Sequence, residues 1–199
     1  MGDTPRADGR SVTLRPGHVR CRPAATWPTP HSFSAPCQTM SQSVRTCSQC
    51  TATTAAGTRC RKRTCRGPVC WQHAQSQHGL RVKPSQIQNA GFGLFATKRM
   101  AKDARIAAYD GERRTRADVK EEYGDETGQY VLCRSDRECF DASASNSSLA
   151  RFANDARGSS FTNNARFTRG AKGPPLLRAA RAIPAGREVL VSYGREYWR

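Results

Sequence analysis

Two stretches in the last third of the chain decide the fold: Arg-Phe-Ala-Asn-Asp-Ala at residues 151–156 and Ile-Pro-Ala-Gly-Arg-Glu-Val-Leu-Val-Ser-Tyr-Gly at residues 183–194. The second stretch opens with a type I turn signal, because Pro184 fixes φ at the second position and Gly186 stands at the fourth. A strand candidate of mostly apolar residues follows this turn and ends just before Tyr193. The chain therefore places a tyrosine at a strand end near its C-terminus.

Short strands and turns continue upstream of these stretches. The strand candidates are residues 80–83, 93–96, 105–109, 130–133, 138–141, 165–167, 176–180 and 188–191. Only residues 116–123 have a clear helix pattern, with Thr115 as the N-cap and Asp118 three residues later in the first turn. Because strands outnumber helices so strongly, the predicted fold class is mostly β, and α+β at most.

Composition divides the 199 residues into three parts. Residues 1–46 hold six arginines and two aspartates without apolar periodicity, so we expect a disordered basic segment. Residues 47–78 form a Cys/His-rich segment, called the Cys-rich segment below, and residues 79–199 form the main domain with the strand pattern. Met40 is a better start than the first residue, which suggests that residues 1–39 are an upstream extension that the native protein lacks.

The chain is strongly basic, with a net charge of +17. Residues 47–80 are the most one-sided part, because they hold five basic residues and no acidic one. A positive field of this kind favours an acidic partner such as nucleic acid or a nucleosome, although a solvated basic face is the simpler reading. No run of 18 apolar residues is present to span a membrane, and no apolar stretch near the first residue indicates a secretory signal. We therefore expect a nuclear, or otherwise cytoplasmic, protein without membrane partners.

Five of the nine cysteines crowd between Cys47 and Cys70, which favours a metal site over disulfides. Their spacing offers three thiolates and an imidazole, the usual ligand set of a structural zinc ion. The candidate ligands are Cys50, Cys60, Cys70 and His73. Cys47 and Cys65 are left over, and Cys47 with Cys50 forms a competing Cys-x-x-Cys pair. So short a segment has few apolar residues, and a metal would supply its folding free energy; the alternative is free thiols in a disordered basic linker.

Together with Gly-Phe-Gly-Leu-Phe-Ala at residues 91–96, the two opening stretches resemble the SET-domain protein lysine methyltransferases. The resemblance covers residues 79–199 and implies several small β-sheets with a knot-like C-terminal crossing. It also implies methyl transfer from S-adenosylmethionine to a lysine of a protein substrate, with a histone as the first candidate. Tyr193 matches the catalytic tyrosine of the family, and Tyr109 matches a tyrosine that lines the lysine channel.

The same resemblance implies a cofactor pocket and a substrate groove. Glycine at positions 91 and 93 permits close backbone approach to the cofactor because it has no Cβ. The implied cofactor residues are Gly91, Phe92, Gly93, Arg151, Phe152, Asn154, Asp155, Tyr197 and Trp198. The last two would stack against the adenine, while Tyr130 and Phe140 correspond to strands that flank the substrate groove.

The chain departs from the family pattern in two ways. Asp155 stands where the family usually has histidine, and Ala156 stands where it has serine or cysteine. The chain also stops at Arg199 without a cysteine-rich post-SET segment, so closure of the channel is expected from Tyr197 and Trp198, from the substrate or from the partner in a homodimer. The first departure favours an alternative function, an inactive SET-like scaffold whose Cys-rich segment binds chromatin or nucleic acid. The presence of both matched tyrosines argues against that alternative.

Overall fold

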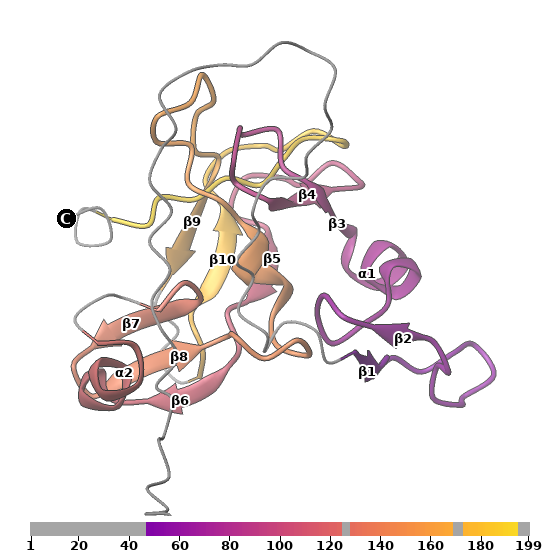
Figure 1. Ribbon diagram of the computed structural model, residues 1–199. Coiled ribbons are helices and arrows are strands. Elements are labelled where there is room, and N and C mark those ends of the chain that lie inside the picture. Colours follow the sequence, from indigo (N-terminus) through magenta and orange to yellow (C-terminus); the bar gives the residue numbers. More distant parts are fainter. Residues whose placement is uncertain (1–46, 125–127, 169–172, 195–199) are drawn as a thin grey trace, which may run out of the picture. The chain divides into compact units, whose positions relative to one another are not determined.

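The chain divides into two units, Met1–Gln38 and Thr39–Arg199. The computed structural model describes residues 47–124, 128–168 and 173–194, so every element below belongs to the second unit (Figure 1). The N-terminal segment that we predicted to be disordered lies outside these residues.

The described residues form short strands joined by turns, with little helix. The strands are β1 (Ser48–Gln49), β2 (Arg63–Thr64), β3 (Leu80–Pro84), β4 (Phe92–Ala96), β5 (Arg105–Ala108), β6 (Glu112–Arg114), β7 (Val131–Ser135), β8 (Glu138–Asp141), β9 (Ala165–Thr168) and β10 (Leu176–Ala179). The helices are α1 (Trp71–His78), α2 (Arg116–Tyr123) and the 3₁₀ turn η2 (Leu149–Phe152).

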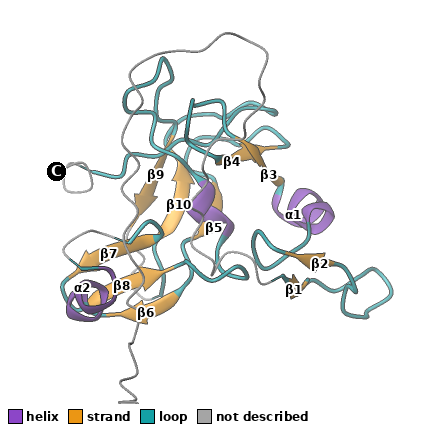
Figure 2. Ribbon diagram, in the orientation of Figure 1, coloured by secondary structure: helices purple, strands orange, loops and turns teal. Residues whose placement is uncertain are grey.

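These strands pair into four small antiparallel sheets (Figure 2). Two are hairpin-like pairs, β1–β2 and β3–β4, and two have three strands in the orders β5–β10–β9 and β6–β8–β7. Helix α2 packs against β7 and β8, and α1 packs against β3. The predicted fold class, mostly β with several small sheets, is therefore confirmed.

Helix α2 and strand β8 have the bounds that the sequence predicts. Thr115 caps α2 reciprocally with Asp118, as expected: the Thr115 hydroxyl accepts from the Asp118 N–H, and the Asp118 carboxylate accepts from the Thr115 N–H. Helix α1 was missed, because its residues are polar and show no apolar period. It ends at Gly79, whose φ of 66° is the left-handed value that glycine adopts without strain.

The strand predicted at residues 188–191 belongs to none of the four sheets. Isolated bridges hold it instead, at Phe95–Glu188, Asn154–Leu190 and Ala165–Val191. Because each residue pairs with a different segment, no continuous ladder forms. The path nevertheless carries the chain past β4, past the turn after η2 and past β9 just before it reaches Tyr193.

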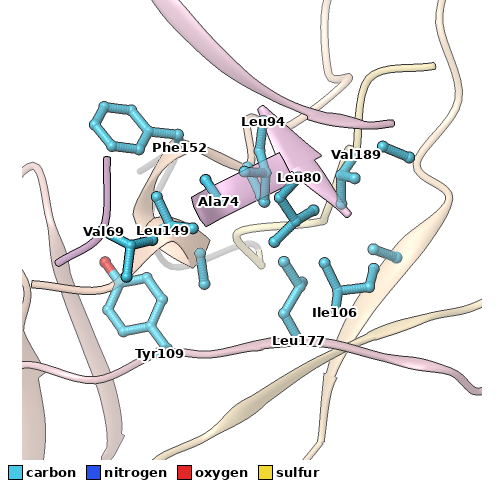
Figure 3. Close-up of a cluster of buried hydrophobic side chains, with 14 of the residues drawn as sticks. Val69, Ala74, Leu80, Leu94, Ile106, Tyr109, Leu149, Phe152, Leu177 and Val189 are labelled. Carbon is cyan, nitrogen blue, oxygen red and sulfur yellow. The ribbon is translucent and has the colours of Figure 1, made fainter. Parts of the chain in front are cut away.

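One buried apolar cluster joins the Cys-rich segment to the sheets (Figure 3). Val69 and Ala74 come from the Cys-rich segment, while Leu80, Leu94 and Leu177 come from strands β3, β4 and β10. Leu80, Leu94 and Leu177 are fully buried. The Cys-rich segment therefore shares its core with the strands, and the predicted boundary at residue 78 is not marked by a break in packing.

Two disulfides form that the sequence did not predict, one of them between the two cysteines left over from the candidate metal site. Cys47 bonds to Cys65, so neither is spare and the competing pair of Cys47 with Cys50 is wrong. The cause is the pairing of β1 with β2, which sets Ser48 opposite Thr64 and brings the flanking cysteines together. A second disulfide, unforeseen in the sequence, joins Cys133 to Cys139, which face each other across β7 and β8.

Candidate functional site

Four side chains of the Cys-rich segment converge into a candidate metal site. The thiols of Cys50, Cys60 and Cys70 and a ring nitrogen of His73 all lie within 4.8 Å of one another. His73 Nδ1 lies 3.5 Å from Cys50 Sγ and 3.3 Å from Cys70 Sγ. Such separations suit one tetrahedral ion bound at about 2.3 Å from sulfur and about 2.1 Å from nitrogen. The donor set therefore fits zinc.

Backbone hydrogen bonds place these ligands. The Cys50 N–H donates to the Lys62 carbonyl at 2.8 Å, and the Cys60 N–H donates to the Ala52 carbonyl at 2.8 Å. Helix α1 begins directly after Cys70, so its first turn carries His73 back toward that thiol. The Cys70 N–H also donates to Cys50 Sγ at 3.1 Å, which holds the two ligands next to each other.

The thiols of this cluster influence one another electrostatically. Burial acts to raise the pKa of Cys70, but hydrogen bonds from the His73 backbone and imidazole outweigh it and lower that pKa to about 7. The Lys62 N–H lowers the pKa of Cys60, but burial and the neighbouring Cys50 thiol together raise it above its ordinary value. Three thiolates this close repel one another, and a bound cation is what removes that repulsion.

A cavity of about 500 Å³ gathers most of the other predicted site residues. The predicted residues that line it are Gly91, Phe92, Tyr130, Arg151, Phe152, Asn154, Asp155 and Tyr193. They come from the start of β4, from η2 and the turn after it, from the residue before β7 and from the C-terminal crossing. Segments that are far apart in sequence therefore meet around one space.

A buried carboxylate organises one side of this cavity. Asn154 Nδ2 donates to the Phe92 carbonyl at 3.0 Å and to Glu188 Oε1 at 3.2 Å. Glu188 is only 3% exposed, and it also accepts from Ser85 Oγ at 2.7 Å and from the Gln86 N–H at 2.8 Å. Glu188 thus fixes the Asn154 amide relative to the loop that leads into β4.

The two matched tyrosines both donate their hydroxyls to backbone carbonyls. Tyr193 Oη donates to Ala153 O at 3.0 Å, and Tyr109 Oη donates to Tyr130 O at 2.9 Å. The Tyr109 ring also meets the Phe167 ring edge-to-face, with centroids 5.5 Å apart. Burial and, next, the proximity of Tyr193 raise the pKa of Tyr109 far above its ordinary value. Its hydroxyl is therefore neutral at any physiological pH.

Arg151 is a buried cation with donors to spare. Its Nη1 donates to the carbonyls of Ala142 and Ala144 at 2.6 and 2.7 Å. Its guanidinium carbon lies 5.1 Å from the Tyr130 ring centroid. Within the part of the chain that the structure describes, its buried Nε and Nη2 have no hydrogen-bond partner. Buried donors of this kind are normally satisfied by a ligand or an ordered water.

Asp155, which departs from the family pattern, connects separate segments of the fold through hydrogen bonds. Its Oδ2 accepts from the Tyr193 N–H at 2.8 Å. Its Oδ1 accepts from Asn163 Nδ2 and from the Arg157 N–H, both at 3.0 Å. The carboxylate therefore fixes the backbone of Tyr193, a role that the sequence did not reveal.

The remaining predicted site residues lie elsewhere. Tyr109 is buried and does not line this cavity. Gly93 is buried and does not line the cavity, and a Cβ there would overlap the Glu188 carboxylate, so glycine at this position makes room for that carboxylate. Phe140 is fully buried in β8 and does not line this cavity. Tyr197 and Trp198 lie outside the described residues, so their predicted adenine contacts stay predictions.

Sequence reasoning missed Glu188, Ser85 and Arg66. Glu188 carried a usable signal, because an acidic residue that opens an apolar strand run is out of place unless it is partnered. Ser85 and Arg66 carried none that indicated a cavity, since Arg66 is one of five basic residues interleaved with the candidate metal ligands. Their relevance comes only from tertiary contacts with Glu188 and with the cavity.

Comparison with known proteins gives a family match. The SET domain model matches residues 91–194. Among solved structures, the methyltransferase domain of human PR domain-containing protein 2 matches with a TM-score of 0.44 and 19% identity, covering 59% of this chain and 78% of that chain. A search of curated proteins gives no match. Neither α1 nor α2 in the described ranges has the length and apolarity needed to cross a bilayer.

Proposed function

Because this chain belongs to the SET-domain family, whose members are typically lysine methyltransferases, we propose that it is an S-adenosylmethionine-dependent protein-lysine N-methyltransferase. A histone or another basic protein is the proposed substrate. The observation that carries the proposal is a single cavity lined by the matched glycine loop, asparagine and tyrosine, namely Gly91, Asn154 and Tyr193.

The residues around the cavity fit a cofactor of this size and polarity. A volume of about 500 Å³ falls within the range of small-molecule sites. The partnerless donors of Arg151 offer hydrogen bonds to a polar ligand. S-adenosylmethionine would supply the methyl group there: the lysine nitrogen forms the new N–C bond with its electron pair, and the S–C bond breaks with its pair left on sulfur.

The tyrosines would orient the amine and keep water away from it. A lysine ammonium has a pKa of about 10.4 and must release its proton to solvent before it can attack. An apolar channel lowers an amine pKa because burial disfavours the charged form. Tyr109 stays protonated, so it contributes no anion that would keep lysine charged. The Tyr193 hydroxyl donates its proton to Ala153 O, so toward the amine it would act as a hydrogen-bond acceptor.

We propose that the Cys-rich segment holds a structural zinc ion and contacts nucleic acid of a nucleosome. Arg59 Nε donates to the Cys50 carbonyl at 3.2 Å, so this arginine supports the ligand loop. Arg61 is exposed and is the better candidate for a phosphate contact. A nuclear location and a homodimer are parts of the same proposal.

Calorimetry tests the cofactor assignment. S-adenosylmethionine and its demethylated product are titrated into the zinc-loaded full chain, and methylation is then assayed on histones and other lysine-containing proteins. We expect Asn154→Ala to weaken binding about tenfold or more, because it removes the amide held by Glu188. Tyr193→Phe should keep binding and lower methylation. Asn146→Ala, an exposed asparagine away from the cavity, is the matched control.

The scaffold alternative gives the opposite result. If the folded, zinc-loaded chain binds neither compound, the methyltransferase proposal is wrong. The SET-like domain would then serve as a scaffold for binding chromatin or nucleic acid.

A further inference from the structure

The Cys-rich segment supplies part of the cavity wall. Cys65 and Arg66 follow β2, and they line the same cavity as Gly91, Phe92 and Tyr193. The Arg66 guanidinium carbon lies 3.9 Å from the centroid of the Phe92 ring. A guanidinium stacked on an aromatic face keeps its N–H donors at its edge, where they remain available to a ligand.

The loop that carries Arg66 is held in place by bonds and by packing. The Cys47–Cys65 disulfide anchors one side of it. On the other side, the Gly67 N–H donates to the Ser145 carbonyl at 2.7 Å. A Cβ on Gly67 would lie 2.6 Å from Leu149 Cδ2, so the backbone packs directly against the core. The position of Arg66 at the cavity is therefore a built feature of the fold.

The charged side chains that line the cavity indicate which kind of ligand Arg66 would bind. The cavity lining contains three arginines, Arg66, Arg151 and Arg157, and one acidic residue, Asp155. Arg151 donates to main-chain carbonyls through Nη1, and its remaining donors, Nε and Nη2, are buried, whereas Arg66 is exposed. Among the described residues, the Arg66 side chain contacts the Phe92 ring and has no hydrogen-bond or ion-pair partner. Because the lining carries an excess of positive charge and the Arg66 guanidinium has N–H donors available, the cavity suits a ligand that carries a carboxylate.

We propose that Arg66 binds the carboxylate at the amino-acid end of S-adenosylmethionine and so helps to select this cofactor. This inference rests on the proposed function. A guanidinium matches a carboxylate with two parallel N–H···O bonds, which a lysine ammonium does not reproduce. It follows that a segment outside the residues matched by the family model completes the cofactor site.

Decarboxylated S-adenosylmethionine isolates this contact, because it lacks only the carboxylate. Both forms are titrated into the zinc-loaded full chain and into Arg66→Gln, Arg66→Lys, Arg157→Gln and Arg137→Gln. We expect Arg66→Gln to weaken binding of the carboxylate form about tenfold or more and to leave the decarboxylated form unchanged. Arg66→Lys should restore part of the loss. Arg137→Gln removes the same charge from an exposed residue away from the cavity and should change neither affinity.

The outcomes separate this inference from the function beneath it. If Arg66→Gln still prefers the carboxylate form as strongly as the parent does, the Arg66 assignment is wrong while the methyltransferase proposal stands. The same holds if Arg157→Gln alone abolishes the preference. If the parent binds neither form, both proposals fall. Zinc content and circular dichroism of each variant show whether it is folded.

Discussion

The Cys-rich segment and the strand domain are held together by different chemistry. Of the six buried apolar residues in residues 47–78, three are the cysteines of the candidate metal site. The strand domain instead buries aliphatic and aromatic side chains such as Leu94, Phe95 and Leu177. Too few apolar atoms are buried in the Cys-rich segment for burial alone to balance its chain entropy. The two regions should therefore respond differently to the same perturbation.

Removal of the metal is the strongest way to break this comparison. A structural zinc ion contributes on the order of 10 kcal/mol to small domains, so a chelator should unfold α1, β1 and β2. Amide hydrogen exchange of the zinc-loaded chain, before and after chelation, measures this region by region. We expect fast exchange throughout residues 47–78 and retained protection in β8 and β10.

Cys60→Ser is the companion variant, because it should show the same pattern without chelator. Complete loss of zinc that leaves α1 protected would mean that the disulfide and shared core suffice for this segment. Both regions would then be stabilised by the same means, the burial of apolar side chains.

Truncation in the strand domain should have the opposite signature. Leu177 is fully buried in the central strand of the β5–β10–β9 sheet. Leu177→Ala should lower the free energy of unfolding by about 2–5 kcal/mol and leave zinc stoichiometry at the parent value. Urea denaturation and metal analysis provide the two readouts. Leu176→Ala, its half-buried neighbour, should cost clearly less, and equal losses would contradict the packing described here.

Glu188 tests how a buried charge supports the cavity. Its oxygens accept from Ser85, Gln86 and Asn154, so Glu188→Gln turns an NH₂ group toward N–H and O–H donors. We expect unfolding free energy to fall by about 1.5–3 kcal/mol and S-adenosylmethionine binding to weaken in parallel. Urea denaturation and calorimetry measure these effects. Glu112→Gln, at an exposed ion pair with Arg114, is the control with little expected change.

Parental stability in Glu188→Gln would show that the carboxylate is dispensable. The cavity wall would then depend on backbone hydrogen bonds alone.

The sequence predicts local features of this molecule better than contacts between distant segments. Strand β8, helix α2 and its cap follow from patterns within a few residues. The metal ligands were chosen from the spacing of cysteines and a histidine within residues 50–73. The crossing at residues 188–191 was read as a strand because its composition fits one, but its partners lie in three separate segments. The role of Asp155 and the proposed role of Arg66 depend on contacts between segments that are distant in sequence, and no local pattern encodes such contacts.

Cysteine pairing illustrates the same limit. Spacing selected three thiols and His73, but it paired Cys47 only with Cys50, as a competing alternative, and gave no partner for Cys65. Their bond depends on how β1 and β2 register, and the Cys133–Cys139 bond depends on the register of β7 and β8. Register is a property of paired strands, so neither disulfide was readable from one strand alone.

The smallest predicted effect lies at the exposed helix of the strand domain, where the sequence succeeded best. Thr115→Ala removes the hydroxyl that accepts from the Asp118 N–H, and it should cost about 1 kcal/mol. Hydrogen bonds from Thr115 hold the pKa of Asp118 below its ordinary value of 3.8. A depressed carboxyl pKa stabilises the folded state above the unfolded pKa, and this contribution is lost as the pH falls through the folded value. The difference in free energy of unfolding between the parent and Asp118→Asn should therefore be largest at neutral pH and should decrease as the pH falls into the acid range. Urea denaturation across that range measures the difference, and a constant difference would mean that the cap acts through geometry and not through the charge of Asp118.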